Sequence, residues 1–218
     1  MSVHLMFPTP VVITDVELTE TQIKDLKVAV QAIFMDNMLH SDPENGQAGS
    51  NAWAEPFPVW TPENLKTFPV LNDIREIFID GFYELAEAHE FNQLSREIVS
   101  DLFADNYGQL PIMKTGDSLP VHTHPGAVAS AVFYLTDVDN EKDGGMLALR
   151  DPSWHTTLGM RNKMEEFIET RAGRLIVFPT QIWHDVRPYY GKEDRLTMVA
   201  NLSYIKPETV RNINMKGD

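Results

Sequence analysis

The sequence has no cysteine among its 218 residues, which excludes disulfide bonds, thiolate metal ligands and a cysteine nucleophile. It also lacks a long apolar run, because the longest mainly apolar stretch, 127–135, is far shorter than the roughly 20 residues that cross a bilayer. Basic residues are scarce: 18 oppose 32 acidic ones, for a formal net charge of −14. This charge argues against nucleic-acid phosphates or an anionic membrane as the main partner.

The first ten residues have no basic segment followed by a long apolar one, so we predict no signal peptide. We expect a cytoplasmic protein with no nucleic-acid and no membrane partner, and we interpret its acidity as simple solubility. At this length the chain should form one domain with a sizeable core. A homodimer is compatible with these features.

The first third of the chain has the pattern of helices and loops. A capping box followed by apolar residues at helical spacing predicts an amphipathic helix over 19–35. A second helix is predicted over about 70–88. The segment 41–69 is rich in Asn, Gly, Pro and Ser and is predicted to be a loop, with Trp53 and Trp60 pinning it to the body.

From about residue 95 the pattern changes to short extended segments separated by turn residues. The predicted strands are 95–104, 110–114, 119–123, 128–135, 146–150, 166–170, 174–178, 183–188 and 195–204. Many short strands without intervening helices favour an antiparallel sandwich or barrel, which residues 152–164 interrupt as an inserted loop. We therefore predict one domain, with residues 1–94 as N-terminal helical and loop decoration and residues 95–206 as a β core.

Three histidines have the spacing of a metal site. Residues i and i+2 of an extended chain point to the same face, so His122 and His124 can converge on one ion. His184 follows the apolar segment 175–179, which is typical of a buried strand. Three protein ligands would leave iron with open positions for a co-substrate and dioxygen, although imidazole suits zinc, copper and nickel equally. Each histidine also has an ordinary interpretation as a surface or half-buried side chain.

An arginine and a threonine follow this motif. Arg195 comes eleven positions after His184, and a hairpin would place Arg195 and Thr197 on a strand beside that histidine. A guanidinium binds a carboxylate through two parallel hydrogen bonds, and a neighbouring hydroxyl adds a donor. The alternative is a surface ion pair of Arg195 with Asp194 or Glu193.

In their order and spacing these motifs resemble the iron(II)/2-oxoglutarate-dependent oxygenase superfamily, and more closely one of its branches. The segments that carry the resemblance are 112–125 (IMKTGDSLPVHTHP), 130–135 (SAVFYL), 144–152 (GGMLALRDP), 173–179 (GRLIVFP), 184–188 (HDVRP) and 195–197 (RLT). The agreement extends over roughly residues 100–204.

The resemblance implies a mainly β (α+β) fold with a double-stranded β-helix core of the jelly-roll or cupin type. It implies His122 and His184 as iron ligands, and Arg195 with Thr197 as the clamp for the distal carboxylate of 2-oxoglutarate. The implied cofactors are Fe(II), 2-oxoglutarate and O2. The implied activity is hydroxylation of a small-molecule or peptide substrate with release of succinate and CO2.

The chain departs from the superfamily pattern at His124, where a carboxylate is usual. We favour a three-histidine centre, in which the site is one unit more positive; the alternative is a carboxylate supplied by Asp151 or Asp137. Two other functions therefore stay open: a cupin-like three-histidine enzyme that does not use 2-oxoglutarate, and a non-catalytic metal-binding protein.

The remaining candidates are weaker. Trp154 and His155, in the inserted loop, would contact substrate if that loop covers the mouth of the barrel. Asp185 alternates away from His184 and is not expected to be a ligand. Tyr134 could reach the pocket, although an aromatic residue there is usually part of the core. We predict no catalytic residue separate from the metal ligands.

Overall fold

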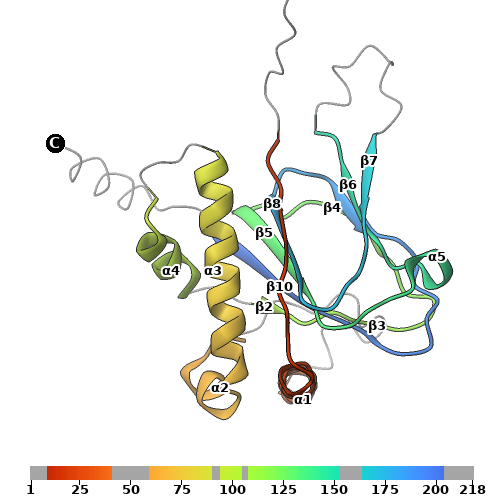
Figure 1. Ribbon diagram of the computed structural model, residues 1–218, viewed down its shortest axis with the longest axis horizontal. Coiled ribbons are helices and arrows are strands. Elements are labelled where there is room, and N and C mark those ends of the chain that lie inside the picture. The colour runs from red at the N-terminus through yellow and green to blue at the C-terminus, as the bar shows by residue number, and fades with distance from the viewer. Residues whose placement is uncertain (1–8, 41–58, 90–93, 105–107, 153–163, 204–218) are drawn as a thin grey trace, which may run out of the picture.

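The computed structural model describes residues 9–40, 59–89, 94–104, 108–152 and 164–203. In this part of the chain two antiparallel sheets face one another, and helices cover the outer face of the larger sheet (Figure 1). The helices are α1 (Glu20–His40), α2 (Pro62–Thr67), α3 (Val70–Ala88), α4 (Arg96–Ala104) and α5 (Asn140–Asp143). The predicted α+β fold with an antiparallel β core is confirmed.

The larger sheet has the order β1-β8-β5-β10-β2, and β3 also pairs with β10. Its strands are β1 (Val12–Asp15), β2 (Gly108–Gln109), β3 (Ile112–Met113), β5 (Ala127–Tyr134), β8 (Arg174–Pro179) and β10 (Arg195–Ser203). Both β5 and β8 lie inside the sheet and are buried on both faces, which explains their almost continuous apolar sequence.

The smaller sheet has the order β4-β9-β6-β7. Its strands are β4 (Leu119–His122), β6 (Leu147–Arg150), β7 (Glu165–Ile168) and β9 (His184–Val186). One face of this sheet looks toward the larger sheet, and the other carries charged and exposed side chains. These are the two facing sheets of a double-stranded β-helix.

Strand alternation divides the core into two layers. Phe133 of β5 points to the helices, where it meets Phe78 of α3 at a ring distance of 6.2 Å. Its neighbour Tyr134 points the other way, into the apolar layer between the sheets. Gly81 lets α3 lie close to the larger sheet, because a Cβ there would be only 2.5 Å from Leu175 Cδ2.

Most of the predicted elements are present, but the strand predicted over 95–104 is wrong. This segment is the helix α4, and Ser95 Oγ accepts a hydrogen bond from Ile98 N at 3.3 Å in its first turn. Two buried residues, Val99 and Phe103, lie four positions apart, which is helical spacing.

The N-terminal third also differs in detail from its prediction. The helix α2 interrupts the segment predicted as loop, and β1 adds an unpredicted strand to the larger sheet by pairing with β8. Trp60 is buried against Phe78 and Phe103, so it does pin this segment to the body. Trp53 lies outside the described residues.

Within the described residues, we find no helix with the length and apolar character needed to cross a membrane.

Candidate metal centre

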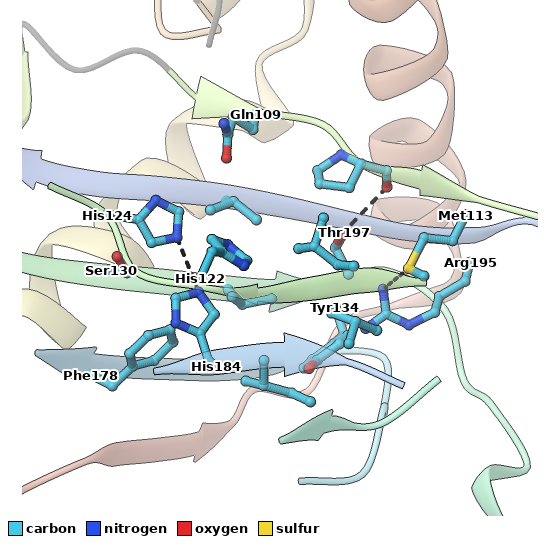
Figure 2. Close-up of a pocket in the computed structure, with 16 residues that line it drawn as sticks. Gln109, Met113, His122, His124, Ser130, Tyr134, Phe178, His184, Arg195 and Thr197 are labelled. Carbon is cyan, nitrogen blue, oxygen red and sulfur yellow. Dashed lines mark hydrogen bonds between the residues drawn. The ribbon is translucent and has the colours of Figure 1, made fainter. Parts of the chain in front are cut away.

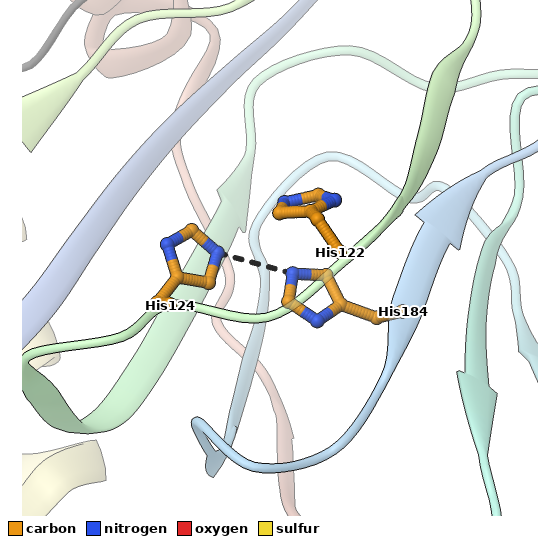
Figure 3. A group of neighbouring side chains, drawn as sticks. All are labelled: His122, His124 and His184. Atoms are coloured by element: carbon orange, nitrogen blue, oxygen red, sulfur yellow. Dashed lines mark hydrogen bonds between the residues drawn. The ribbon is translucent and has the colours of Figure 1, made fainter.

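The three histidines come together at one end of the smaller sheet (Figure 3). His122 ends β4 and pairs directly with His184 at the start of β9, while His124 lies just beyond β4. One ring nitrogen from each lies within 4.8 Å of the others, and Nε2 of His124 is 3.1 Å from Nε2 of His184. A single ion could therefore contact all three side chains.

Backbone carbonyl groups orient two of the rings. His122 Nδ1 is 2.8 Å from the carbonyl oxygen of Pro120, and His184 Nδ1 is 2.9 Å from that of Ile182. Because a carbonyl can only accept, Nδ1 is the protonated donor in both rings, which leaves Nε2 with its lone pair. This carbonyl contact fixes ring and tautomer in the way usual for metal-binding histidines.

Burial keeps two of the histidines neutral. Together with a smaller effect of the neighbouring His122, it lowers the pKa of His184 to about 3 and that of His124 to about 4. A metal ion requires the unprotonated imidazole. The site therefore holds these two ligands in their metal-binding form at neutral pH.

Arg195 lies in the space between the sheets and forms no ion pair with any residue that the structure describes. Its side chain is only 2% exposed, and its Nη1 donates to the sulfur of Met113 at 3.2 Å. Its Nε and the hydroxyl of Tyr134 are buried and have no hydrogen-bond partner within the described segments. Burial lowers the pKa of the guanidinium. The ion pair with Asp194 or Glu193, the alternative raised from sequence, does not occur in the described part of the chain.

A cavity of about 220 Å³ connects the histidines with the arginine (Figure 2). It is lined by Gln109, Pro111, Met113, Leu119, His122, His124, Ser130, Val132, Tyr134, Leu147, Phe178, His184, Val186, Arg195, Thr197 and Val199. Sequence reasoning missed Gln109, Ser130 and Met113. The only signal for them was strand alternation, which does not tell which strands become neighbours.

The structure places the other sequence candidates elsewhere. Asp185 points away from the cavity and lies 3.3 Å from Arg150 Nη2 and 3.4 Å from Arg187 Nε. Asp137 accepts a hydrogen bond from Ala172 N, and neither it nor Asp151 belongs to the histidine group.

Of the four remaining candidates for contacts in the cavity, two lie within the described residues. Tyr134 and Thr197 both line the cavity, and the Thr197 hydroxyl donates to the carbonyl of Pro111 at 3.4 Å. Trp154 and His155 lie outside the described residues.

Solved structures with the same fold are numerous. A prolyl-4-hydroxylase from Pseudomonas putida has a TM-score of 0.57 at 15% identity, over 90% of this chain and 94% of its own. A Trichoplax adhaerens prolyl hydroxylase, in complex with a hypoxia inducible factor peptide, has a TM-score of 0.56 at 12% identity, over 95% and 87%. The iron-bound HygX from Streptomyces hygroscopicus has a TM-score of 0.52 at 10% identity, over 91% and 83%. No curated protein matches the sequence.

The fold is that of a double-stranded β-helix, and its three clustered histidines could hold a metal ion. Residues 110–201 match the family model described as "Putative 2OG-Fe(II) oxygenase". This segment therefore resembles the 2OG-Fe(II) oxygenases, a family that uses Fe(II), 2-oxoglutarate and O2.

Proposed function

We propose that this protein is an iron(II)- and 2-oxoglutarate-dependent oxygenase in which His122, His124 and His184 bind the metal. Arg195, with Thr197, holds the distal carboxylate of 2-oxoglutarate. One observation carries this proposal: three converging imidazoles and a buried arginine without an anion line the same cavity. The substrate is a small molecule or a peptide.

The residues present fit both groups. Imidazole nitrogen is a good ligand for iron, and three protein ligands leave positions open. An unpaired guanidinium between the sheets is costly unless an anion accepts its hydrogen bonds. A carboxylate at that point would be held by Arg195 Nε and the Tyr134 hydroxyl, the two buried groups that have no partner.

When bound, iron(II) with 2-oxoglutarate and O2 supplies the oxidising chemistry that hydroxylates a C–H bond and releases succinate and CO2. The protein's own part is positioning and exclusion of water. The carbonyl groups of Pro120 and Ile182 hold two imidazoles in their ligand tautomer. Apolar side chains such as Phe178, whose ring is 4.8 Å from that of His184, exclude water from the metal.

Other features of the chain complete the proposal. We take residues 1–218 as one domain, with residues 95–206 as the core that carries the site. We expect a cytoplasmic protein that has no nucleic-acid or membrane partner and can form a homodimer. If Trp154 and His155 contact the substrate, they do so at the mouth of the cavity.

A second function is favoured by one observation: no carboxylate among the described residues belongs to the histidine group. A three-histidine enzyme that does not use 2-oxoglutarate would have this ligand set. It would have no use for a buried, unpaired Arg195 in the same cavity, so we place it second. A non-catalytic metal-binding protein would likewise leave this arginine unexplained.

Titration of 2-oxoglutarate into the iron(II)-loaded protein under anaerobic conditions tests the proposal. A metal-to-ligand charge-transfer band in the visible range should grow and saturate at a single equivalent. Zinc-loaded protein is the control and should show no band. Iron binding without this band would remove 2-oxoglutarate from the mechanism and favour the three-histidine alternative.

A further inference from the structure

The cavity wall formed by the larger sheet consists of three rows of side chains. Paired across β10 and β5, they are Thr197 with Tyr134, Val199 with Val132, and Asn201 with Ser130; of these six residues, Asn201 alone does not line the cavity. The third row continues to Phe178, which pairs with Ser130 and contacts the ring of His184. The histidine group therefore lies over the third row, and the apolar second row separates it from the arginine end.

Three neutral polar side chains gather at the histidine end. Gln109 pairs with Val199 from the other side of β10 and lines the cavity with Ser130 (Figure 2). Ser130 is fully buried, and its hydroxyl donates to Asn201 Oδ1 at 2.6 Å. This bond orients the Asn201 amide and leaves its N–H groups available. The side-chain amide of Gln109 makes no hydrogen bond within the described residues.

Apart from the metal that the proposed function places there, this end has no charged side chain. Among the described lining residues, Arg195 is the only one of the Lys, Arg, Asp and Glu types. The proposed function assigns Arg195 to the co-substrate. A second carboxylate or an ammonium group would then have no described side chain with which to form an ion pair, and the metal would also repel the ammonium group. A neutral group that both donates and accepts would find matching partners in the Gln109 amide and the Ser130 hydroxyl.

The size of the cavity limits what enters it. Its volume of about 220 Å³ is below the roughly 300–1,000 Å³ of pockets that enclose a drug-sized ligand. The cavity can therefore take a small co-substrate and the reacting end of a substrate, while the remainder of a larger substrate stays outside. The groups at the histidine end thus select the chemistry of that reacting end.

We propose that Gln109 and Ser130, with Asn201 positioning the Ser130 hydroxyl, form a substrate-recognition site for a neutral carboxamide. The substrate presents a peptide-type or primary amide beside the metal, where Gln109 offers it one donor and one acceptor. This assignment rests on the proposed function, because it assumes that 2-oxoglutarate occupies Arg195.

Three small probes of equal size and different charge test this assignment. Zinc-loaded protein with saturating 2-oxoglutarate is mixed with 2-methylpropanamide, 2-methylpropanoate and 2-methylpropylammonium, and binding is measured by saturation-transfer NMR. The amide should bind at least tenfold more tightly than either ion. Equal binding of the three probes would overturn the proposal.

Variants of Gln109 make the test specific. Gln109→Glu keeps the shape of the side chain and adds a negative charge, so the preference should move from the amide to the ammonium probe. Gln109→Leu and Asn201→Leu should each weaken amide binding severalfold. Gln31→Glu makes the same charge change on an exposed position of α1 and should leave the preference unaltered. Unchanged probe binding in the Gln109 variants would contradict the assignment.

Binding of 2-oxoglutarate to the same proteins separates the possible failures. If Gln109→Leu weakens the binding of 2-oxoglutarate as much as Arg195→Ala does, the histidine end of the cavity binds the co-substrate and the inference is wrong. If the unaltered iron-loaded protein does not bind 2-oxoglutarate at all, the proposed function itself fails. Zinc affinity equal to that of the unaltered protein shows that each variant has kept the site intact.

Discussion

The two sheets contribute different parts of the site. All three histidines come from the smaller sheet and the turn beside it, whereas Arg195, Thr197 and Tyr134 come from the larger one. The larger sheet has helices packed on its outer face, while the smaller sheet has an ion-pair network there, formed around Asp185. Metal binding and carboxylate binding are therefore expected to respond separately to substitution.

The largest effect on stability should come from the helix-covered face of the larger sheet. Phe133→Ala removes a fully buried ring between that sheet and α3 and should lower the free energy of unfolding by about 3–5 kcal/mol. Phe167→Ala, on the outer face of the smaller sheet and 45% exposed, is the matched control and should cost less than about 1 kcal/mol. Urea unfolding at constant m-value measures both. Similar losses would show that the two sheets do not differ in this way.

Removal of a ligand should damage metal binding and little else. His124→Ala should weaken the affinity for iron(II) or zinc at least about 100-fold, which corresponds to roughly 2.7 kcal/mol. In the control Asp151→Ala, the metal affinity should stay within about twofold of that of the unaltered protein, because Asp151 lies outside the histidine group. Competition with a coloured chelator gives both affinities. A loss confined to Asp151→Ala would identify a carboxylate as the third ligand.

A substitution that weakens 2-oxoglutarate binding and spares metal binding is expected in the larger sheet. Arg195→Ala should weaken 2-oxoglutarate binding by about 1.5–3 kcal/mol, the range for a hydrogen bond to a charged group. Arg195→Lys should also lose affinity, because an ammonium cannot reproduce the planar fork. Calorimetry on the metal-loaded protein is the measurement. If both variants lost metal as well, Arg195 would have a structural role and the two sheets would not act independently.

The smallest effect is expected at the edge of the larger sheet, where Asp15 of β1 is hydrogen-bonded to Arg174 at 2.6 and 2.8 Å. These bonds lower the pKa of Asp15 from its ordinary value of 3.8. A lowered folded-state pKa stabilises the protein above the unfolded value, and this contribution is lost as the pH falls through the folded-state pKa. Because the pair is exposed, Asp15→Asn should cost only about 0.2–1 kcal/mol at neutral pH.

Thermal unfolding at several pH values checks this last prediction. The difference between Asp15→Asn and the unaltered protein should shrink toward acid pH and in high salt. If the loss of stability caused by Asp15→Asn did not shrink at acid pH, packing and not charge would hold β1 in place.

Sequence reasoning succeeded where neighbours in the chain are also neighbours in space. His122 and His124 are two positions apart, so their convergence could be predicted. The hairpin expected to place Arg195 and Thr197 on a strand beside His184 is wrong, because β9 and β10 belong to different sheets; His184 and Arg195 line the same cavity from those two sheets. The roles of Ser130 and Asn201 could not be predicted. They depend on the pairing of β5 with β10, which brings together two residues 71 positions apart in the sequence. The strand β1 was missed for the same reason: its partner Arg174 is 159 positions from Asp15.

The error over 95–104 has a different physical cause. Ile98 and Val99 are β-branched and favour strands, and the following segments are strands. The helix α4 forms nevertheless, because Ser95 caps its first turn and because Val99 and Phe103 pack into the helical side of the core. Tertiary packing here overrides a local preference.

The strand β10 has a consequence for the range of molecules that this pocket can accept over evolutionary time. Thr197 and Asn201 are four residues apart on it, which is about 13 Å at roughly 3.3 Å per residue. Substitutions can change the side chains at either end of this stretch of β10. The distance between the two ends can change only in steps of two residues, because side chains on one face of a strand are two residues apart. A single inserted or deleted residue would turn every cavity-facing side chain of β10 toward the helices. Related enzymes built on this strand should therefore diverge in the chemistry that they select much more readily than in the length of co-substrate that they hold.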